Sequence, residues 1–114
     1  MKTQKITVAY KIWLEKDGKP MLGKGGAQIL EAIKTEKSVS KAAEKLGMSY
    51  RYVWNYVDRM NTILGEPVVK AYRGGKQGGG GANLTMQGEQ LLKKFKQTEK
   101  RIKETLTNKQ RPKA

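Results

Sequence analysis

Arg51 and Asn55 stand four residues apart in the segment SYRYVWNYVDR, so a helix over this segment would carry both side chains on one face. Arginine can donate two hydrogen bonds to O6 and N7 of guanine, and asparagine can pair with N6 and N7 of adenine. Ser49 and Tyr50 begin the helix, where hydroxyl and amide groups suit phosphate, and Tyr52 can contact backbone or a thymine methyl group. The spacing predicts recognition of double-stranded DNA. Two alternatives stay open: Ser49 only caps the helix, and Arg51 contacts only phosphate.

The charge of the chain also fits a polyanionic partner. Its 114 residues include 24 Lys and Arg but only 10 Asp and Glu, which gives a formal net charge of +14. Nucleic acid is the first candidate partner and an anionic membrane surface the second. The chain has no cysteine and no histidine, which excludes disulfides, zinc fingers and imidazole chemistry, and no paired carboxylates suggest a catalytic cleft. We therefore expect a protein that is not an enzyme and needs no metal or cofactor.

No apolar run approaches the ~18 residues of a membrane span, and the N-terminus alternates rather than forming the core of a signal peptide. We therefore expect a cytoplasmic protein with no membrane partner.

Two helices joined by a tight turn are predicted around the DNA-reading pair. Ser38 can cap a short helix through Leu46, and Gly47 can adopt the left-handed conformation that ends it. Ser49 can cap a second helix that runs to about Leu64. Two helices separated by a three-residue turn with a glycine form a helix-turn-helix.

The spacing within this unit separates an inner from an outer face. Ala43 falls where the helices cross, and Val53 fills the space between them. On a helical wheel with Val53 inside, the other inward positions are apolar: Val57, Met60 and Leu64. The opposite side is polar and is the predicted DNA face, made of Arg51, Asn55, Asp58 and Thr62 and flanked by Tyr52 and Arg59. Trp54 lies on the flank and is expected to pack in the core, and Asp58 is expected to pair with Arg51, Lys41 or Arg59.

A glycine-rich hairpin is predicted next. Residues 68–73 and a return near 82–84 are expected to be strands, and six of the eight residues from Gly74 to Gly81 are glycine. Glycine leaves its amides free to lie against phosphates, and Arg73, Lys76 and Gln77 are the predicted DNA contacts of this wing. Because ordering glycine is entropically costly, we expect the wing to be mobile when free and ordered on DNA. The alternative is a flexible connector.

The flanking segments complete the predicted fold. The alternation in ITVAYKIWL predicts a strand from Ile6 to Leu14, and Asp17-Gly18 predicts a turn to a short strand through Met21 and Leu22. Two alternatives stay open for this hairpin: it only covers one face of the core, or it also takes part in dimerisation or in contact with the DNA backbone. A core helix is expected from about Gly26 to Glu36. The segment GKPMLGK has the spacing of a phosphate-binding loop, but Gly25 follows it instead of Ser or Thr, so nucleotide binding is rejected.

The last helix, expected to start after a Thr85 cap and to end near residue 107, has a narrow apolar seam. Such a seam needs a partner, which is either the domain body or a second chain. We predict a dimer interface along the seam, formed by Leu92, Phe95, Ile102 and Leu106. Residues 108–114 are expected to be a disordered basic tail.

The chain from Ile6 to Phe95 resembles the N-terminal domain of ModE-type molybdate-responsive regulators, and more distantly the LysR-type winged helix. The matching features are the paired alanines before the turn, GMSY, Trp54, MN, GEP, the GG…GGGGA wing, and Thr85 with Gly88 in LT…G. Full-length regulators of this type carry C-terminal molybdate-binding domains, for which 114 residues leave no room. Molybdate sensing is therefore not carried over, no small-molecule effector is evident, and the chain is either a stand-alone DNA binder or a fragment.

These observations predict a mainly α fold with small β-hairpins. The expected organisation is a winged helix-turn-helix domain over residues 1–88, with an N-terminal hairpin at 5–24, the helix-turn-helix at 38–64 and the wing at 68–84, followed by a long dimerisation helix at 85–107. The expected function is a homodimeric, sequence-specific, nucleoid-associated regulator of transcription. Two alternatives remain: an architectural, chromatin-like DNA-coating protein with low sequence specificity, and a protein-interaction module.

Overall fold

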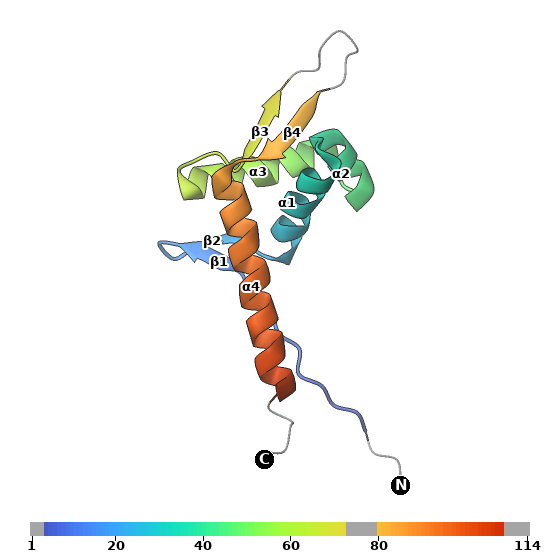
Figure 1. Cartoon of the computed structure of the whole chain (residues 1–114), viewed down its shortest axis with the longest axis vertical. Coiled ribbons are helices and arrows are strands. Elements are labelled where there is room, and N and C mark those ends of the chain that lie inside the picture. Colours follow the sequence, from blue (N-terminus) through green and yellow to red (C-terminus); the bar gives the residue numbers. More distant parts are fainter. Residues whose placement is uncertain (1–3, 73–79, 109–114) are drawn as a thin grey trace.

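The computed structural model describes residues 4–72 and 80–108 and has four helices and two short antiparallel hairpins (Figure 1). The winged helix-turn-helix expected from the sequence is confirmed. The elements in chain order are β1 (Leu14–Lys16), β2 (Lys19–Leu22), α1 (Lys24–Glu36), α2 (Val39–Leu46), α3 (Tyr50–Leu64), β3 (Val69–Tyr72), β4 (Gly81–Leu84) and α4 (Met86–Asn108).

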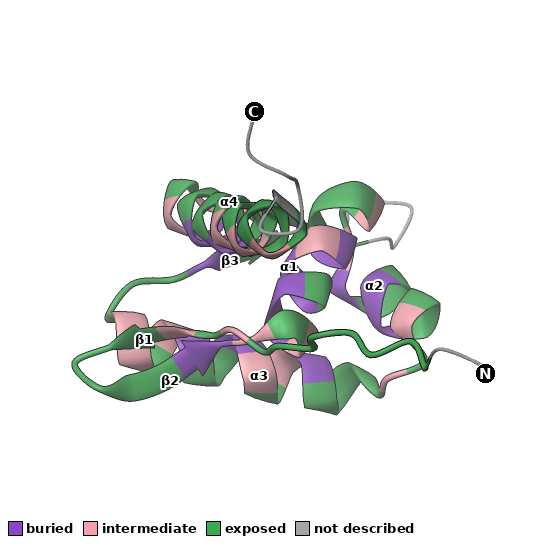
Figure 2. Ribbon diagram, turned by 90° about the horizontal axis from the view of Figure 1, so that it is seen from below, coloured by how far each residue is buried: buried purple, intermediate pink, exposed green. Residues whose placement is uncertain are grey.

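Helix α1 is the centre of the hydrophobic core. Its Ile29, Leu30 and Ile33 side chains are fully buried, and α2, α3, α4, β2 and β4 all contact this helix. Figure 2 shows buried residues on the inward sides of these elements and exposed residues around their outer sides. The core lies between α1 and its neighbours, so α3 needs to bury only one of its faces.

Local capping groups define the ends of the helix-turn-helix, as the sequence predicts. The Ser38 hydroxyl accepts a hydrogen bond of 3.1 Å from the Lys41 N–H, and the Ser49 hydroxyl accepts one of 3.0 Å from the Tyr52 N–H. Gly47 ends α2 with φ 68°, a left-handed conformation that glycine adopts without a steric penalty. Each helix therefore begins and ends where its own sequence specifies.

The prediction of an N-terminal strand from Ile6 to Leu14 is wrong for most of its length. The first hairpin pairs only Leu14 with Leu22, Glu15 with Pro20 and Lys16 with Lys19. The chain enters α1 at Lys24, directly after β2, so no strand remains opposite residues 4–13. These residues are assigned to no strand or helix. The hairpin is thus confined to residues 14–22 instead of 5–24, and α1 begins two residues earlier than expected.

Helix α4 packs on the body of its own subunit along its first half. Leu92 and Phe95 are 3% and 2% exposed within the single chain, so these two side chains belong to the core and not to the predicted dimer interface. Ile102 and Leu106, further along the same seam, are only half-buried. The seam thus has two parts: the first contacts α1, and the second extends past the domain body (Figure 1).

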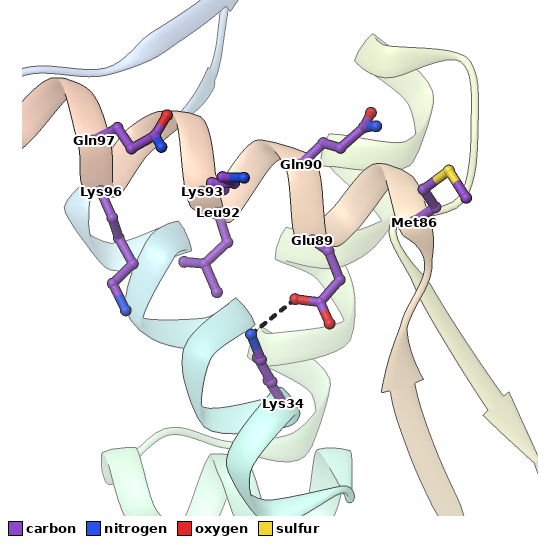
Figure 3. Close-up of a pocket in the computed structure, with 8 residues that line it drawn as sticks. All are labelled: Lys34, Met86, Glu89, Gln90, Leu92, Lys93, Lys96 and Gln97. Atoms are coloured by element: carbon purple, nitrogen blue, oxygen red, sulfur yellow. Dashed lines mark ion pairs between the residues drawn. The ribbon is translucent and has the colours of Figure 1, made fainter.

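Two ion pairs also hold α4 against α1. Lys34 Nζ lies 2.9 Å from Glu89 Oε1, and Lys96 Nζ lies 2.6 Å from Glu31 Oε1. Figure 3 shows the first pair below the proximal part of α4, beside Leu92. The hydrogen bond that Lys34 donates to Glu89, together with the charge of the Glu89 carboxylate, raises the pKa of Lys34 above its ordinary value. Exposed ion pairs of this kind contribute little to the free energy of unfolding, so the buried apolar side chains of α4 stabilise its position more than these pairs do.

Candidate nucleic-acid interface

Helix α3 has a fully buried inner face and an exposed outer face. Val53, Val57 and Met60 are 0% exposed and point into the core, whereas Arg51 and Asn55 are exposed. The inward face deduced from the helical wheel is confirmed, except that Leu64 is only half-buried at the end of the helix. Arg51 and Asn55 are therefore free to meet a ligand that approaches α3 from outside.

Two exposed tyrosines frame the first turn of α3. Tyr50 is 56% and Tyr52 is 51% exposed, so both phenol groups are accessible beside Arg51. The Ser49 hydroxyl accepts the capping hydrogen bond, as predicted, and can still donate its own proton to a phosphate. Trp54 is half-buried against the core, and its ring meets that of Tyr50 edge-on with centroids 6.4 Å apart. The tryptophan thus supports Tyr50 from the side.

Further along α3, two charged residues have different surroundings. The Arg59 guanidinium lies over the ring of Tyr56 and remains exposed. The distance from Arg59 Cζ to the ring centroid is 5.8 Å. Asp58 makes no ion pair within 4.0 Å in the described part of the chain, so the predicted pairing with Arg51, Lys41 or Arg59 is absent there. Asp58 places a negative charge on the same face as Arg51 and Asn55.

Asn61 and Thr85 fix the root of the wing, and neither was assigned this role from the sequence. Asn61 Oδ1 accepts a hydrogen bond of 2.8 Å from the Val68 N–H, which joins α3 to the start of the wing. The Thr85 hydroxyl donates to the Pro67 carbonyl at 2.7 Å and accepts from the Gly88 N–H at 3.1 Å, so it caps α4 as predicted and also holds the preceding chain. Thr85 stands directly before α4, so its position was an available signal, whereas Asn61 lies within the last turn of α3 and gave none.

The wing strands pair in a regular antiparallel register, from Val69 with Leu84 to Tyr72 with Gly81. A side chain at Gly81 would collide with the Tyr72 ring, which shows that this ring lies across the glycine. Beneath the pair lies a groove formed by the wing root and the first turns of α2 and α3, lined by Ser38, Ser40, Tyr50, Trp54, Tyr72 and Gly81. The groove joins the α3 surface to the wing.

The predicted DNA contacts of the wing, Arg73, Lys76 and Gln77, lie outside the described residues. The prediction that the wing is mobile concerns the same residues.

The described residues carry none of the other sites considered. They include no group of three His, Cys, Asp or Glu side chains that could hold a metal ion. None of the helices in this part of the chain is long and apolar enough to cross a membrane. The α3 surface with the adjoining groove is therefore the candidate site.

Residues 26–89, which contain this surface, match the model of bacterial regulatory helix-turn-helix proteins of the lysR family. The chain belongs to this family. The matched segment begins in α1 and ends in the first turn of α4, so it includes both helices of the helix-turn-helix and the wing. The family assignment and the observed fold therefore describe the same part of the molecule.

Curated relatives share this part of the chain and confirm the resemblance to ModE-type DNA-binding domains. The molybdenum-pterin-binding protein MopB of Rhodobacter capsulatus is 46% identical over 79 residues, which cover 69% of this chain and 28% of the relative. The molybdenum transport protein ModE of Azotobacter vinelandii is 38% identical over 72 residues, which cover 63% of this chain and 26% of the relative. The DNA-binding transcriptional dual regulator ModE of Escherichia coli is 36% identical over 67 residues, which cover 59% of this chain and 25% of the relative. The chain thus spans about a quarter of the length of these relatives.

Two solved structures share the fold. ArgP from Mycobacterium tuberculosis superposes with a TM-score of 0.53 at 22% identity, over 75% of this chain and 30% of that chain. The BenM DBD/catB site 1 DNA complex gives the same TM-score at 17% identity, over 71% of this chain and 83% of that chain. At these identities the likeness concerns architecture, which is that of the winged helix-turn-helix described above.

Proposed function

We propose that the chain binds double-stranded DNA sequence-specifically and acts as a regulator of transcription. The observation that carries this proposal is the outward position of Arg51 and Asn55 on α3, opposite the buried Val53. In helix-turn-helix proteins the second helix enters the major groove with its first turns, and those turns hold this pair. Membership of a family of bacterial regulators and the net charge of +14 support the same function.

The proposed contacts divide into base-reading and positioning groups. Arg51 reads guanine and Asn55 reads adenine. The remaining contacts, at phosphate or thymine methyl groups, come from Ser49, Tyr50, Tyr52 and Arg59 on α3 and from Arg73, Lys76 and Gln77 on the wing. Asp58 repels phosphate and so limits how deeply the second half of α3 can enter the groove.

The proposed assembly is a homodimer on a palindromic site. Ile102 and Leu106 remain half-exposed where α4 passes beyond the domain body, so this distal part of α4 is the proposed contact between subunits. Two recognition helices would then lie about 34 Å apart, one turn of DNA, or a multiple of that distance.

The proposed function includes no effector and places the chain on the nucleoid. The relatives named for molybdenum match only over about a quarter of their length, so we carry over DNA binding and assign this chain no effector, cofactor or enzymatic role. A chain that binds duplex DNA in this way would lie in the cytoplasm on the nucleoid. Architectural coating is the less favoured function, because the family and one of the relatives, ModE of Escherichia coli, are regulators by name.

The test compares binding to genomic target fragments with binding to random DNA at fixed salt. A regulator should prefer its target by more than ~10³-fold, whereas a coating protein should show a ratio near one. If 6–10 phosphates are contacted, affinity should fall about 10³–10⁵-fold between 50 and 200 mM salt. A ratio near one, or an affinity that salt does not change, would refute the proposed function.

A further inference from the structure

Residues 4–13 form an apolar segment that its own subunit leaves largely uncovered. Ile6, Val8, Tyr10 and Ile12 alternate with other residues, so an extended chain carries all four on one face. Ile6 is 86% and Val8 is 70% exposed, and the burial increases only toward Ile12, which packs against the core. The part of the segment farthest from the core thus keeps a strand pattern without a covered face.

The backbone of this segment also lacks partners within the described chain. No backbone–backbone hydrogen bond joins residues 4–13 to any described residue, and strand pairing begins only at Leu14. A row of free N–H and C=O groups with alternating apolar side chains is the template that another strand can join. The segment therefore has both features of an unpaired strand edge.

The segment lies away from the proposed DNA surface. In Figure 1 it leaves the domain at the same end as the distal part of α4, and the wing projects from the opposite end. Tyr10 lines a shallow groove together with Glu99, Lys100 and Lys103 of α4, next to the half-exposed part of the apolar seam. A protein bound here would leave Arg51 and Asn55 accessible.

We propose that residues 5–13 pair as an antiparallel strand with the same residues of a second copy of this chain. This inference rests on the proposed homodimer and adds a second, separate contact to it. A two-fold axis brings identical surfaces together, so two free edges of the same sequence satisfy each other's backbone groups at once. The same axis would bring the distal parts of the two α4 helices to this end of the assembly.

The extent of the segment and its charges favour one register, because only an axis at Ala9 pairs every residue from Lys5 to Trp13 within the segment. A two-fold axis at Ala9 pairs Ile6 with Ile12 and Val8 with Tyr10 of the second copy, which places all four apolar residues on one face. In this register Lys5 faces the exposed Trp13, and Lys11 faces Thr7. An axis at Val8 would instead set Lys5 against Lys11, and like charges directly opposite are destabilising. We therefore assign the axis to Ala9.

Single cysteines test this register directly, because the chain has none of its own. Residues opposite each other in an antiparallel pair have Cβ atoms about 4.5–5.5 Å apart, near the Cβ separation of a disulfide. In the full-length chain without DNA, A9C should form a cross-linked dimer at least about tenfold faster than T7C, since two residues at position 7 would lie roughly 13 Å apart along the strands. E44C, on an exposed position of α2, is the control and should not cross-link.

A second variant needs no oxidation. V8P removes a backbone donor and should raise the dissociation constant of the dimer about tenfold or more, measured by analytical ultracentrifugation. Because residue 8 lies outside the core, circular dichroism should show an unchanged fold, and binding to a single half-site should persist.

The outcomes separate this inference from the proposals on which it rests. A wild-type chain that stays monomeric at all concentrations overturns both the homodimer and the strand pair. A stable dimer in which no cysteine of the segment cross-links and V8P has no effect overturns the strand pair alone. Fastest cross-linking at T7C overturns the assigned register. None of these results bears on whether Arg51 reads DNA.

Discussion

Asn61 Oδ1 accepts a hydrogen bond of 2.8 Å from the backbone N–H of Val68, and this bond joins the last turn of α3 to the chain that enters the wing. Val68 is fully buried, so its N–H depends on Asn61 for a hydrogen-bond acceptor. Asn61 thus holds the start of the wing against α3, while Thr85 holds the same stretch of chain from the side of α4.

We expect N61L to destabilise the protein by about 1–3 kcal/mol, because a buried N–H would lose its acceptor. The melting temperature followed by circular dichroism should fall by several degrees. N61D keeps an acceptor at the same position and should melt closer to wild type. If N61L melts like wild type, the bond does not have the role described here.

Gly88 and Gly25 both lie in helices, but the space around the two residues differs. A β-carbon at Gly88 would collide with the Val68 carbonyl oxygen, whereas one at Gly25 would meet nothing within 4 Å. G88A should therefore cost about 1–3 kcal/mol through overpacking, and G25A should stabilise the protein by up to about 1 kcal/mol through helix propensity. Chemical denaturation of both variants measures the difference, and equal effects would contradict the close contact at Gly88.

Arg51 and Asn55 should control sequence preference more than overall affinity for DNA. R51A and N55A should each lose about 1–3 kcal/mol of discrimination at one base pair of the target. K94A removes one positive charge from an exposed position of α4 and should weaken target and random DNA alike. Competition binding with single-base variants of the target distinguishes these cases. The base-reading role fails if R51A behaves like K94A.

Phe95 and Leu106 lie on one seam of α4 but should respond differently to truncation. F95A should destabilise the subunit by about 3–5 kcal/mol, because its ring is almost fully buried in the core. L106A should cost less than about 1 kcal/mol in the isolated subunit, since Leu106 is half-exposed, but it should weaken the proposed dimer. Unfolding curves measured above and below the dimer dissociation constant test both expectations. Equal losses of stability in F95A and L106A at low protein concentration would contradict the division of the seam into a buried first part and an exposed second part.

The helix-turn-helix could be predicted almost residue by residue because its boundaries are local. Ser38, Gly47 and Ser49 form or permit their caps with neighbours three or four residues away, so the sequence alone contains the relevant partners. The inward face of α3 follows from the helical period for the same reason.

Apart from the predicted ion pair of Asp58, the errors concern contacts between distant segments. The alternation from Ile6 to Leu14 predicts a strand, but it does not reveal that β2 is too short to pair with one. Leu92 and Phe95 have the spacing of a helix-helix seam, and spacing does not distinguish α1 from a second chain. The hydrogen bond of Asn61 joins residues seven positions apart across a change of element, which no periodicity reports.

The Ala82 N–H donates a hydrogen bond of 2.9 Å to the carbonyl of Lys37, the residue between α1 and the Ser38 cap of α2. The return strand of the wing is thereby fastened to the junction of the two helices that support α3. We therefore expect the root of the wing and α3 to keep a fixed separation. If both contact DNA as proposed, a target with one base pair inserted between their two contact points would have to deform, because the protein would not bend to follow it.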